Sequence, residues 1–148
     1  MYKHILIATD GSDLASKGVV QGLALAEGLG AKATILTVAE PLSTDAVAAA
    51  EAAGFFQAAN RYDQQIAADM QERLAELEKE TEKHSIAIDL RHDVHEHPAE
   101  AIISFAKLND VDLIVMTSHG RRGIQRLVLG SQTSEVLAGS SIPVLVIR

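Results

Sequence analysis

The sequence predicts an α/β protein: a five-stranded parallel sheet with helices on both faces, in a single domain that spans residues 1–148. Short runs rich in Val, Ile and Leu alternate along the chain with longer segments of helical character. No hairpin turn joins consecutive runs, so each connection is expected to be a right-handed crossover between parallel strands. The chain is 47% hydrophobic but only 3% aromatic, which indicates closely packed aliphatic layers and excludes disorder.

Five apolar runs, each bounded by turn residues, have the length and composition of strands. Most are continuously aliphatic, as in parallel sheets that are covered on both faces. The third run instead alternates apolar and polar residues, which predicts a strand at an edge of the sheet. The predicted strands are His4–Thr9, Ala33–Val38, Ile86–Val94, Asp112–Thr117 and Pro143–Ile147.

The segments between these strands carry helix start and stop signals. Ser12 can cap the first helix, Gly30 ends it, and Pro98 suits the first turn of a later one. The predicted helices are Asp13–Leu29, Arg61–Lys83, Pro98–Leu108 and Ser131–Ala138. The second of them has four apolar side chains on one face: Ile66, Met70, Leu74 and Leu77. That apolar seam is too short to favour the alternative, a coiled coil, and the Glu/Lys run from 76 to 83 is expected to face water.

The stretch from 40 to 60 has two readings. Pro41 and Ser43 can open a helix, and the alanines after Val47 favour one, but Gly54 and the pair Phe55-Phe56 interrupt it. We expect either a short helix or a mobile flap, which could cover a ligand as a lid.

Charge and composition exclude several classes of function. The net charge of −7 repels nucleic-acid phosphates, and the short arginine group at 121, 122 and 126 is too small for a duplex footprint. The chain has no cysteine, which excludes disulfides and thiol catalysis and fits a cytoplasmic protein. The first apolar run is too short for a signal peptide, and no segment approaches a membrane span. We therefore expect neither a nucleic-acid partner nor a membrane.

Two strand ends carry unusual glycine and polar content: Thr9–Ser12 after the first strand, and 117–120 (TSHG) after the fourth. Ligands of open parallel sheets bind outside the carboxyl ends of the strands, where the winding direction reverses. In a 3-2-1-4-5 sheet these two ends would be neighbours at that point. The pattern also allows the order 2-1-3-4-5.

The second of these loops continues to Gly130-Ser131, which opens the last helix. Free N–H groups at a helix start attract anions, and glycines permit close approach of the backbone. Ser131 has no Glu or Gln three residues later, so there is no capping box and its hydroxyl could bond a phosphate oxygen. Gly120 and Gly130 would then hold a polyphosphate from both sides. The competing interpretation is that these glycines are ordinary turns and caps, since neither a Walker loop nor a dinucleotide fingerprint is present.

Four stretches make the chain resemble the universal stress proteins over its whole length: ILIATDGSDLASKGV, ILTVAEP, HPAEAIISFA and MTSHGRRGIQRLVLGSQTSEVLAGSSIPVLVI. Nucleotide-binding members of that family carry G-x2-G-x9-G-[ST]. Here Gly120, Gly130 and Ser131 match the pattern, while Thr117 replaces its first glycine. Threonine keeps the backbone N–H but disfavours a positive φ. The resemblance implies a Rossmann-like, adenine-nucleotide α hydrolase-like fold.

The resemblance also implies roles for individual residues in binding ATP, ADP or AMP, with or without magnesium. Asp10 would lie at the adenine–ribose end, the Val38 backbone would read the adenine edge, and Met116 would pack on the base. The implied nucleotide-binding set is Ala8, Thr9, Asp10, Val38, Met116, Thr117, Gly120, Gly130, Ser131 and Gln132. Family members commonly dimerise through their last strands. The apolar PVLVI strand therefore predicts a homodimer.

Catalytic and metal chemistry find little support. Ser118 and His119 are adjacent, which rarely suits the proton transfer of a hydrolase triad. His95 and His97 would share one face of a strand end, near His92, but complete no zinc motif, so we expect solvated histidines and no metal site. Arg121 and Arg122 could reach a terminal phosphate or be solvated. We expect a dimeric, nucleotide-binding stress-response module and not an enzyme. The alternatives are a nucleotide-independent interaction protein and a slow ATPase.

Overall fold

A computed structural model describes residues 1–118 and 129–148 of the chain. In these residues the elements follow in the order β1 His4–Thr9, α1 Asp13–Leu29, β2 Lys32–Ala39, α2 Thr44–Ala52, α3 Ala58–Thr81, β3 Ile88–Val94, α4 Pro98–Leu108, β4 Leu113–Thr117, α5 Ser131–Gly139 and β5 Val144–Ile147. The predicted strands and helices are confirmed in type, with ends that differ by a few residues.

The five strands form one parallel sheet in the order β3-β2-β1-β4-β5. This order excludes the 2-1-3-4-5 sheet that the sequence left open. It also places β1 beside β4, with Ile7 opposite Val115, so that the winding reverses between these two strands. The predicted edge position of β3 is confirmed, and β5 forms the other edge.

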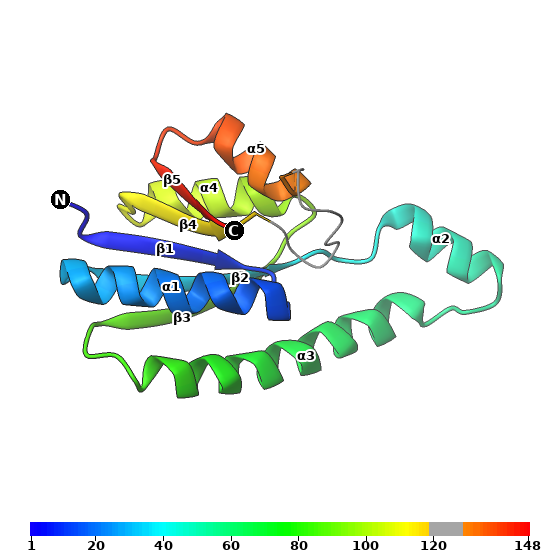
Figure 1. Ribbon diagram of the computed structural model, residues 1–148. Helices are drawn as coiled ribbons and strands as arrows, with labels where there is room; N and C mark the ends of the chain where they lie inside the picture. The colour runs from blue at the N-terminus through cyan, green and yellow to red at the C-terminus, as the bar shows by residue number, and fades with distance from the viewer. Residues whose placement is uncertain (119–128) are drawn as a thin grey trace.

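Helices cover both faces of the sheet (Figure 1), and every residue of β1 is buried. Ile5 and Ile7 pack with the apolar side chains of α1, and Leu77 of α3 lies against the same cluster. Leu6 and Ala8 pack on the opposite face with residues of α4 and with Val136 of α5. Because both faces are covered by helices, the strands are aliphatic throughout, as the sequence predicts.

Helix α1 begins and ends as its sequence indicates. The Ser12 hydroxyl accepts from the Ala15 N–H at 3.2 Å, and Gly30 closes the helix in the left-handed conformation at φ 64°. Two glycines let this helix approach the sheet closely. An added Cβ at Gly22 would lie 2.8 Å from Ile7, and one at Gly18 would lie 2.6 Å from the Thr117 methyl carbon.

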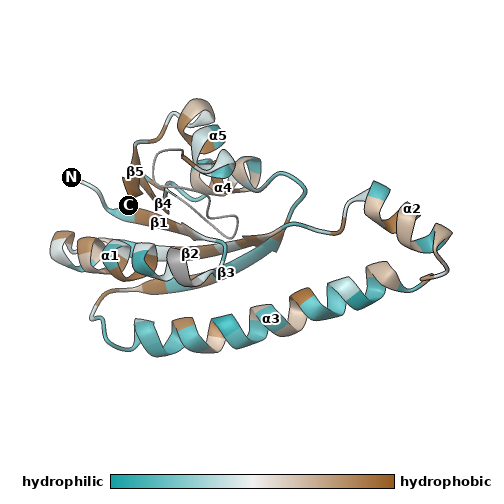
Figure 2. Ribbon diagram, turned by 45° about the vertical axis from the view of Figure 1, so that its right-hand side comes forward, coloured by the Kyte–Doolittle hydropathy of each residue, from teal (hydrophilic) through white to brown (hydrophobic). Residues whose placement is uncertain are grey.

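Helices α2 and α3 form a helical hairpin that extends beyond the sheet (Figure 1). We refer to residues 44–81 as the hairpin. The segment from 44 to 52 is helical and is capped by Ser43, so the expected short helix in that stretch is confirmed. Met70 is the one buried residue of α3, and most of the helix is hydrophilic (Figure 2). The turn between the two helices exposes Phe55 (63%) and Phe56 (78%).

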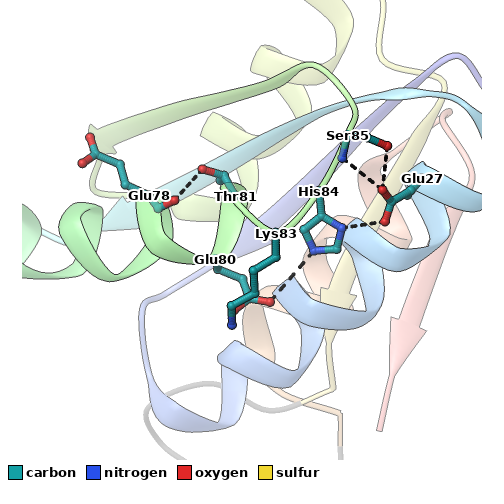
Figure 3. A network of polar contacts seen from close by, with 7 residues as sticks. All are labelled: Glu27, Glu78, Glu80, Thr81, Lys83, His84 and Ser85. Carbon is teal, nitrogen blue, oxygen red and sulfur yellow. Dashed lines mark hydrogen bonds and ion pairs between the residues drawn. The ribbon is translucent and has the colours of Figure 1, made fainter.

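A polar network joins the residues that directly follow α3 to α1 (Figure 3). Glu27 accepts hydrogen bonds from the Ser85 N–H at 3.0 Å, the Ser85 hydroxyl at 2.9 Å and His84 Nδ1 at 2.9 Å. The Ser85 N–H, the His84 ring and the Ser85 hydroxyl lower the pKa of Glu27 from 4.5 to about 2. The C-terminal end of α3 is therefore held by a charged carboxylate, whereas its start is not.

Candidate functional site

The candidate site lies where β1 and β4 end side by side, at the carboxyl edge of the sheet. Ile7 pairs with Val115, so Thr9 and Thr117 each follow two residues later, at the same level. The two loops predicted to be neighbours therefore start next to each other, and the helices that follow these strands, α1 and α5, pack on opposite faces of the sheet. This is the position in the topology at which doubly wound sheets hold their ligands.

The loop after β1 is a tight turn built from its own side chains. The Gly11 N–H donates to Thr9 Oγ1 at 3.0 Å, and the Ser12 N–H donates to Asp10 Oδ1 at 2.9 Å. Gly11 has φ 74°, a conformation that favours glycine. Asp10 thus braces the turn that precedes α1, and its half-buried carboxylate remains at the carboxyl edge of β1.

The backbone of Val38 projects past the end of β1. The β1–β2 ladder ends at the pair Thr9–Thr37, whereas the β2–β3 ladder continues to Ala39 and Val94. The side of Val38 that faces β1 therefore extends beyond that strand, where the family resemblance implies that its backbone reads an adenine edge. The side chains of Ala8, Val38 and Met116 are buried in the core toward α4 and α5. Their contact with a base remains a prediction.

Thr117 occupies its position without the positive φ that a glycine would allow. It is the last residue of β4, and among the described non-glycine residues Asp110 has a positive φ, at 52°. The Thr117 methyl group lies over Gly18 of α1, and its carbonyl accepts from the Thr133 hydroxyl at 2.9 Å. Thr117 is thus accommodated by a glycine on the facing helix, and it joins β4 to α5.

Helix α5 starts at the same edge. The Gly130 N–H donates to the Ser118 carbonyl at 2.7 Å, and the Ser118 N–H donates to the Ile147 carbonyl at 2.8 Å. Gly130 is the N-cap of α5 and has no side chain to offer to the first turn. The first N–H groups of a helix have no partner within the helix, so this end can receive an anion. The Ser131 side chain is exposed beside it.

Gln132 has partners that the sequence did not predict. Its Oε1 accepts from the Ala99 N–H at 3.0 Å, in the first turn of α4, and its Nε2 donates to Glu40 Oε1 at 3.3 Å. The Gln132 amide therefore braces the start of α4 against α5 and the end of β2. Its predicted phosphate contact is not tested by this arrangement.

Part of the predicted cradle lies outside the described residues. This applies to Gly120, to Arg121 and Arg122, and to His119 of the triad that we did not favour. The described part of the site thus comprises the β1 loop, the ends of β2 and β4, and the start of α5.

Three residues at this edge escaped the sequence analysis: Gly18, Arg73 and Glu40. Arg73 Nη1 donates to the Asp10 carbonyl at 3.4 Å, and the Tyr62 hydroxyl donates to the Glu40 carbonyl at 3.2 Å. One signal could have found Arg73. It lies three residues after Met70 and four before Leu77, on the side of α3 that is otherwise apolar.

A hollow of about 300 Å³ lies at the opposite, amino edge of the sheet, with His4, Thr34, Phe105 and Asn109 in its lining. His4 is 5% exposed; its Nδ1 donates to the Asn109 carbonyl at 2.9 Å, and Thr34 Oγ1 donates to its Nε2 at 2.8 Å. Burial lowers the pKa of His4 below its ordinary 6.5, since the charged imidazolium would lose its hydration. Both ring nitrogens are engaged, so His4 joins β1, β2 and the loop after α4.

The histidines at the end of β3 do not come together with further ligands. His95 and His97 lie with ring centroids 6.2 Å apart, and His95 Nδ1 accepts from the His97 N–H at 2.9 Å. Within residues 1–118 and 129–148, no group of three or more His, Asp or Glu side chains could hold a metal ion. Nor does that part of the chain contain a helix long and apolar enough to cross a membrane.

The strand order and the loops at the β1–β4 switch define a class: a doubly wound α/β protein of the adenine-nucleotide α hydrolase-like type. Within this class the chain belongs to the universal stress protein family, whose family model matches residues 1–148. The resemblance on which the sequence analysis relied is thereby confirmed.

Two related proteins match along their whole length. A universal stress protein of Thermus aquaticus is 32% identical over 152 residues, with all of both chains covered. Universal stress protein YxiE of Bacillus subtilis is 29% identical over 151 residues, again with all of both chains covered. The chain is thus similar in extent as well as in sequence to these two proteins.

Solved structures share the fold. The protein MJ0577 of Methanocaldococcus jannaschii superposes with a TM-score of 0.78 at 26% identity, over 99% of this chain and 96% of that one. A universal stress protein in complex with cAMP superposes with a TM-score of 0.64, also at 26% identity, over 99% of this chain and 97% of that one. One structural relative has therefore been crystallised with an adenine nucleotide.

Proposed function

We propose that this protein binds an adenine nucleotide (ATP, ADP or AMP) at the carboxyl edge of its sheet and acts as a dimeric regulatory or protective module in a stress response. The observation that carries the proposal is the meeting of three main-chain segments at one edge: the β1 loop, the end of β4 and the glycine-capped start of α5. The cAMP complex of a structural relative supports the choice of an adenine nucleotide.

The donor chemistry of the described residues fits such a ligand. Phosphate oxygens suit the first-turn amides of α5 and the exposed Ser131 hydroxyl, because a helix start carries partial positive charge. The Asp10 carboxylate can accept a hydrogen bond from a ribose hydroxyl, and the Val38 backbone can form hydrogen bonds with the edge of the base. We propose Gly120 as the opposite side of the phosphate cradle, with magnesium balancing the phosphate charge. The protein would then bind and orient the nucleotide, and no described residue is assigned to its hydrolysis.

The decisive substitution is Gly130→Leu. Gly130 has φ −57° and ψ 150°, which any residue can adopt, so a side chain there does not strain the backbone. It would, however, fill the approach to the start of α5. We expect the Kd for ATP with magnesium, measured by calorimetry, to rise at least tenfold, since a hydrogen bond to a charged group contributes about 1.5–3 kcal/mol.

The matched control is Gly28→Leu. Gly28 lies in α1, and an added Cβ there meets nothing within 4 Å, so ATP affinity should stay within about twofold of the wild type. Wild-type protein without ATP affinity would remove the proposal. Equal ATP affinity of the wild type and the Gly130 variant would show that the phosphates do not bind at the start of α5.

A second function is favoured by the exposed aromatic pair Phe55 and Phe56 at the turn of the hairpin. In that alternative the protein binds a partner without nucleotide, and the glycines are structural. The Gly130 variant separates the two functions, because in the alternative its partner binding would be unchanged.

Dimerisation is proposed through β5, an edge strand whose Leu145 is 41% exposed. A native mass spectrum should show two subunits together with the retained nucleotide.

A further inference from the structure

Arg73 lies midway along α3 and reaches the loop that ends β1. Its hydrogen bond to the Asp10 carbonyl is long, at 3.4 Å, and would be weak by itself. The same side chain also packs against Gly11, where an added Cβ would lie 2.7 Å from Arg73 Cδ and 2.9 Å from Cζ. Gly11 is thus needed both for its positive φ and for the space that Arg73 occupies.

The position of Arg73 on its helix explains why it can reach this loop. Met70 is buried and Leu77 packs on the α1 side of the sheet, so the face of α3 between them is turned toward the sheet. A charged residue on such a face places its stem over apolar surface and its head at the nearest polar groups. For Arg73 those groups belong to the Asp10–Gly11 turn. Its planar guanidinium can lie flat on a peptide unit, which a lysine ammonium cannot do.

The turn that Arg73 covers sets the direction of the Asp10 carboxylate. Asp10 Oδ1 accepts from the Ser12 N–H at 2.9 Å, so the side chain is oriented by the main chain on either side of Gly11. Arg73 holds that main chain at the Asp10 carbonyl and at Gly11. A change in Arg73 would therefore be transmitted to the carboxylate through the backbone, without any contact between Arg73 and a ligand.

A second contact keeps the hairpin in register with this edge. The Tyr62 hydroxyl donates to the Glu40 carbonyl, just after β2, and the Glu40 carboxylate accepts from Gln132 of α5. The hairpin therefore meets the site at the ends of both β1 and β2. These two attachments restrict how far α3 can move relative to Asp10.

We propose that Arg73 is a positioning residue of the nucleotide site, which holds the Asp10–Gly11 turn so that the Asp10 carboxylate faces the ribose hydroxyls. This inference rests on the proposed function. It adds that the ribose preference of the site depends on a residue of α3, 63 positions away along the chain.

The test compares ATP with 2′,3′-dideoxyATP, which lacks both ribose hydroxyls. In Arg73→Ala the calorimetric Kd for ATP should rise about tenfold while that for the dideoxy analogue changes less than about twofold. Arg73→Lys should recover only part of the ATP affinity. Arg61→Ala, an exposed position on the same helix, is the matched control and should leave both values unchanged. In Asp10→Ala, the Arg73 substitution should cause no further loss, because the two residues act as a unit.

A measurement without nucleotide accompanies these titrations. Amide hydrogen exchange at Gly11 and Ser12 should be faster in Arg73→Ala than in the wild type or in Arg61→Ala. Unchanged exchange would overturn the inference, and so would an equal loss of affinity for both nucleotides. If the wild type binds neither nucleotide, the proposed function fails together with the inference; if it binds ATP and the Arg73 variant keeps the same preference, the inference alone fails.

Discussion

At the amino edge of the sheet, a buried histidine has both ring nitrogens hydrogen-bonded, whereas at the carboxyl edge α5 starts with a glycine cap and an exposed serine. His4 bonds to Asn109 and Thr34 at the first edge, and Glu27 collects three donors nearby. At the other edge Gly11 and Gly130 shape the loops. This difference fits an amino edge that supports stability and a carboxyl edge at which we propose that the nucleotide binds.

The largest expected effect is at the amino edge, in His4→Ala. This change leaves a cavity and removes the partners of the Asn109 carbonyl and the Thr34 hydroxyl, so we expect a loss of about 2–4 kcal/mol in the free energy of unfolding. Chemical denaturation measures it, and ATP affinity should not change. His92→Ala, at an exposed position of β3, is the control.

The same residue predicts a pH dependence. Its folded-state pKa is lowered from 6.5, so the unfolded chain takes up the proton first as the pH falls. The stability is therefore fully present above about pH 6.5 and decreases below it, and this part of the slope should be missing in His4→Ala. A variant with the wild-type slope would contradict the assignment.

The next largest effect on stability is expected at the contact between Gly18 and Thr117, near the carboxyl edge. Gly18→Ala would place its Cβ 2.6 Å from the Thr117 methyl carbon, and such overpacking costs about 1–3 kcal/mol. Thr117→Ser removes that methyl group and keeps the hydroxyl, so the double variant should regain most of the stability. Thermal unfolding of the single and double variants measures the coupling. Additive effects of the two substitutions would show that the residue tolerated at position 18 does not depend on the Thr117 methyl group.

The smallest effect is expected for Glu27→Gln. The folded pKa of Glu27 is about 2 against 4.5 in the unfolded chain, so its contribution is present above about pH 4.5 and is lost as the pH falls toward 2. The variant should be less stable than the wild type at neutral pH, and the two should converge near pH 2. Glu135→Gln, on the exposed side of α5, should show no such convergence. A difference that persists at pH 2 would assign the effect to packing.

Much of the architecture could be predicted because it depends on local patterns. The aliphatic run from His4 to Thr9, the Ser12 cap and the Gly30 stop are each visible within a few residues, and all three were confirmed. The residues of the β1 loop were also found locally, as a glycine and polar cluster after a strand. The strand order was left open because several orders place the same faces in the core.

The contacts that define the site edge could not be predicted in the same way. Arg73 meets Asp10 across 63 positions of the chain, and Thr133 meets Thr117 across 16. Nothing in the pattern around Gly18 indicates that its missing side chain makes room for Thr117. Such pairs exist only after two helices have settled on the same sheet, since packing chooses the partners.

By itself, the sequence determined which segments are strands and helices, which loops carry the glycines, and the family to which the chain belongs, because these properties follow from residues close together in the chain. The tertiary structure alone decided that β1 lies beside β4, that α3 brings an arginine to the Asp10 turn, and that His4 is enclosed at the opposite edge. These depend on long-range packing, in which burial and steric fit select one arrangement among several that local preferences allow.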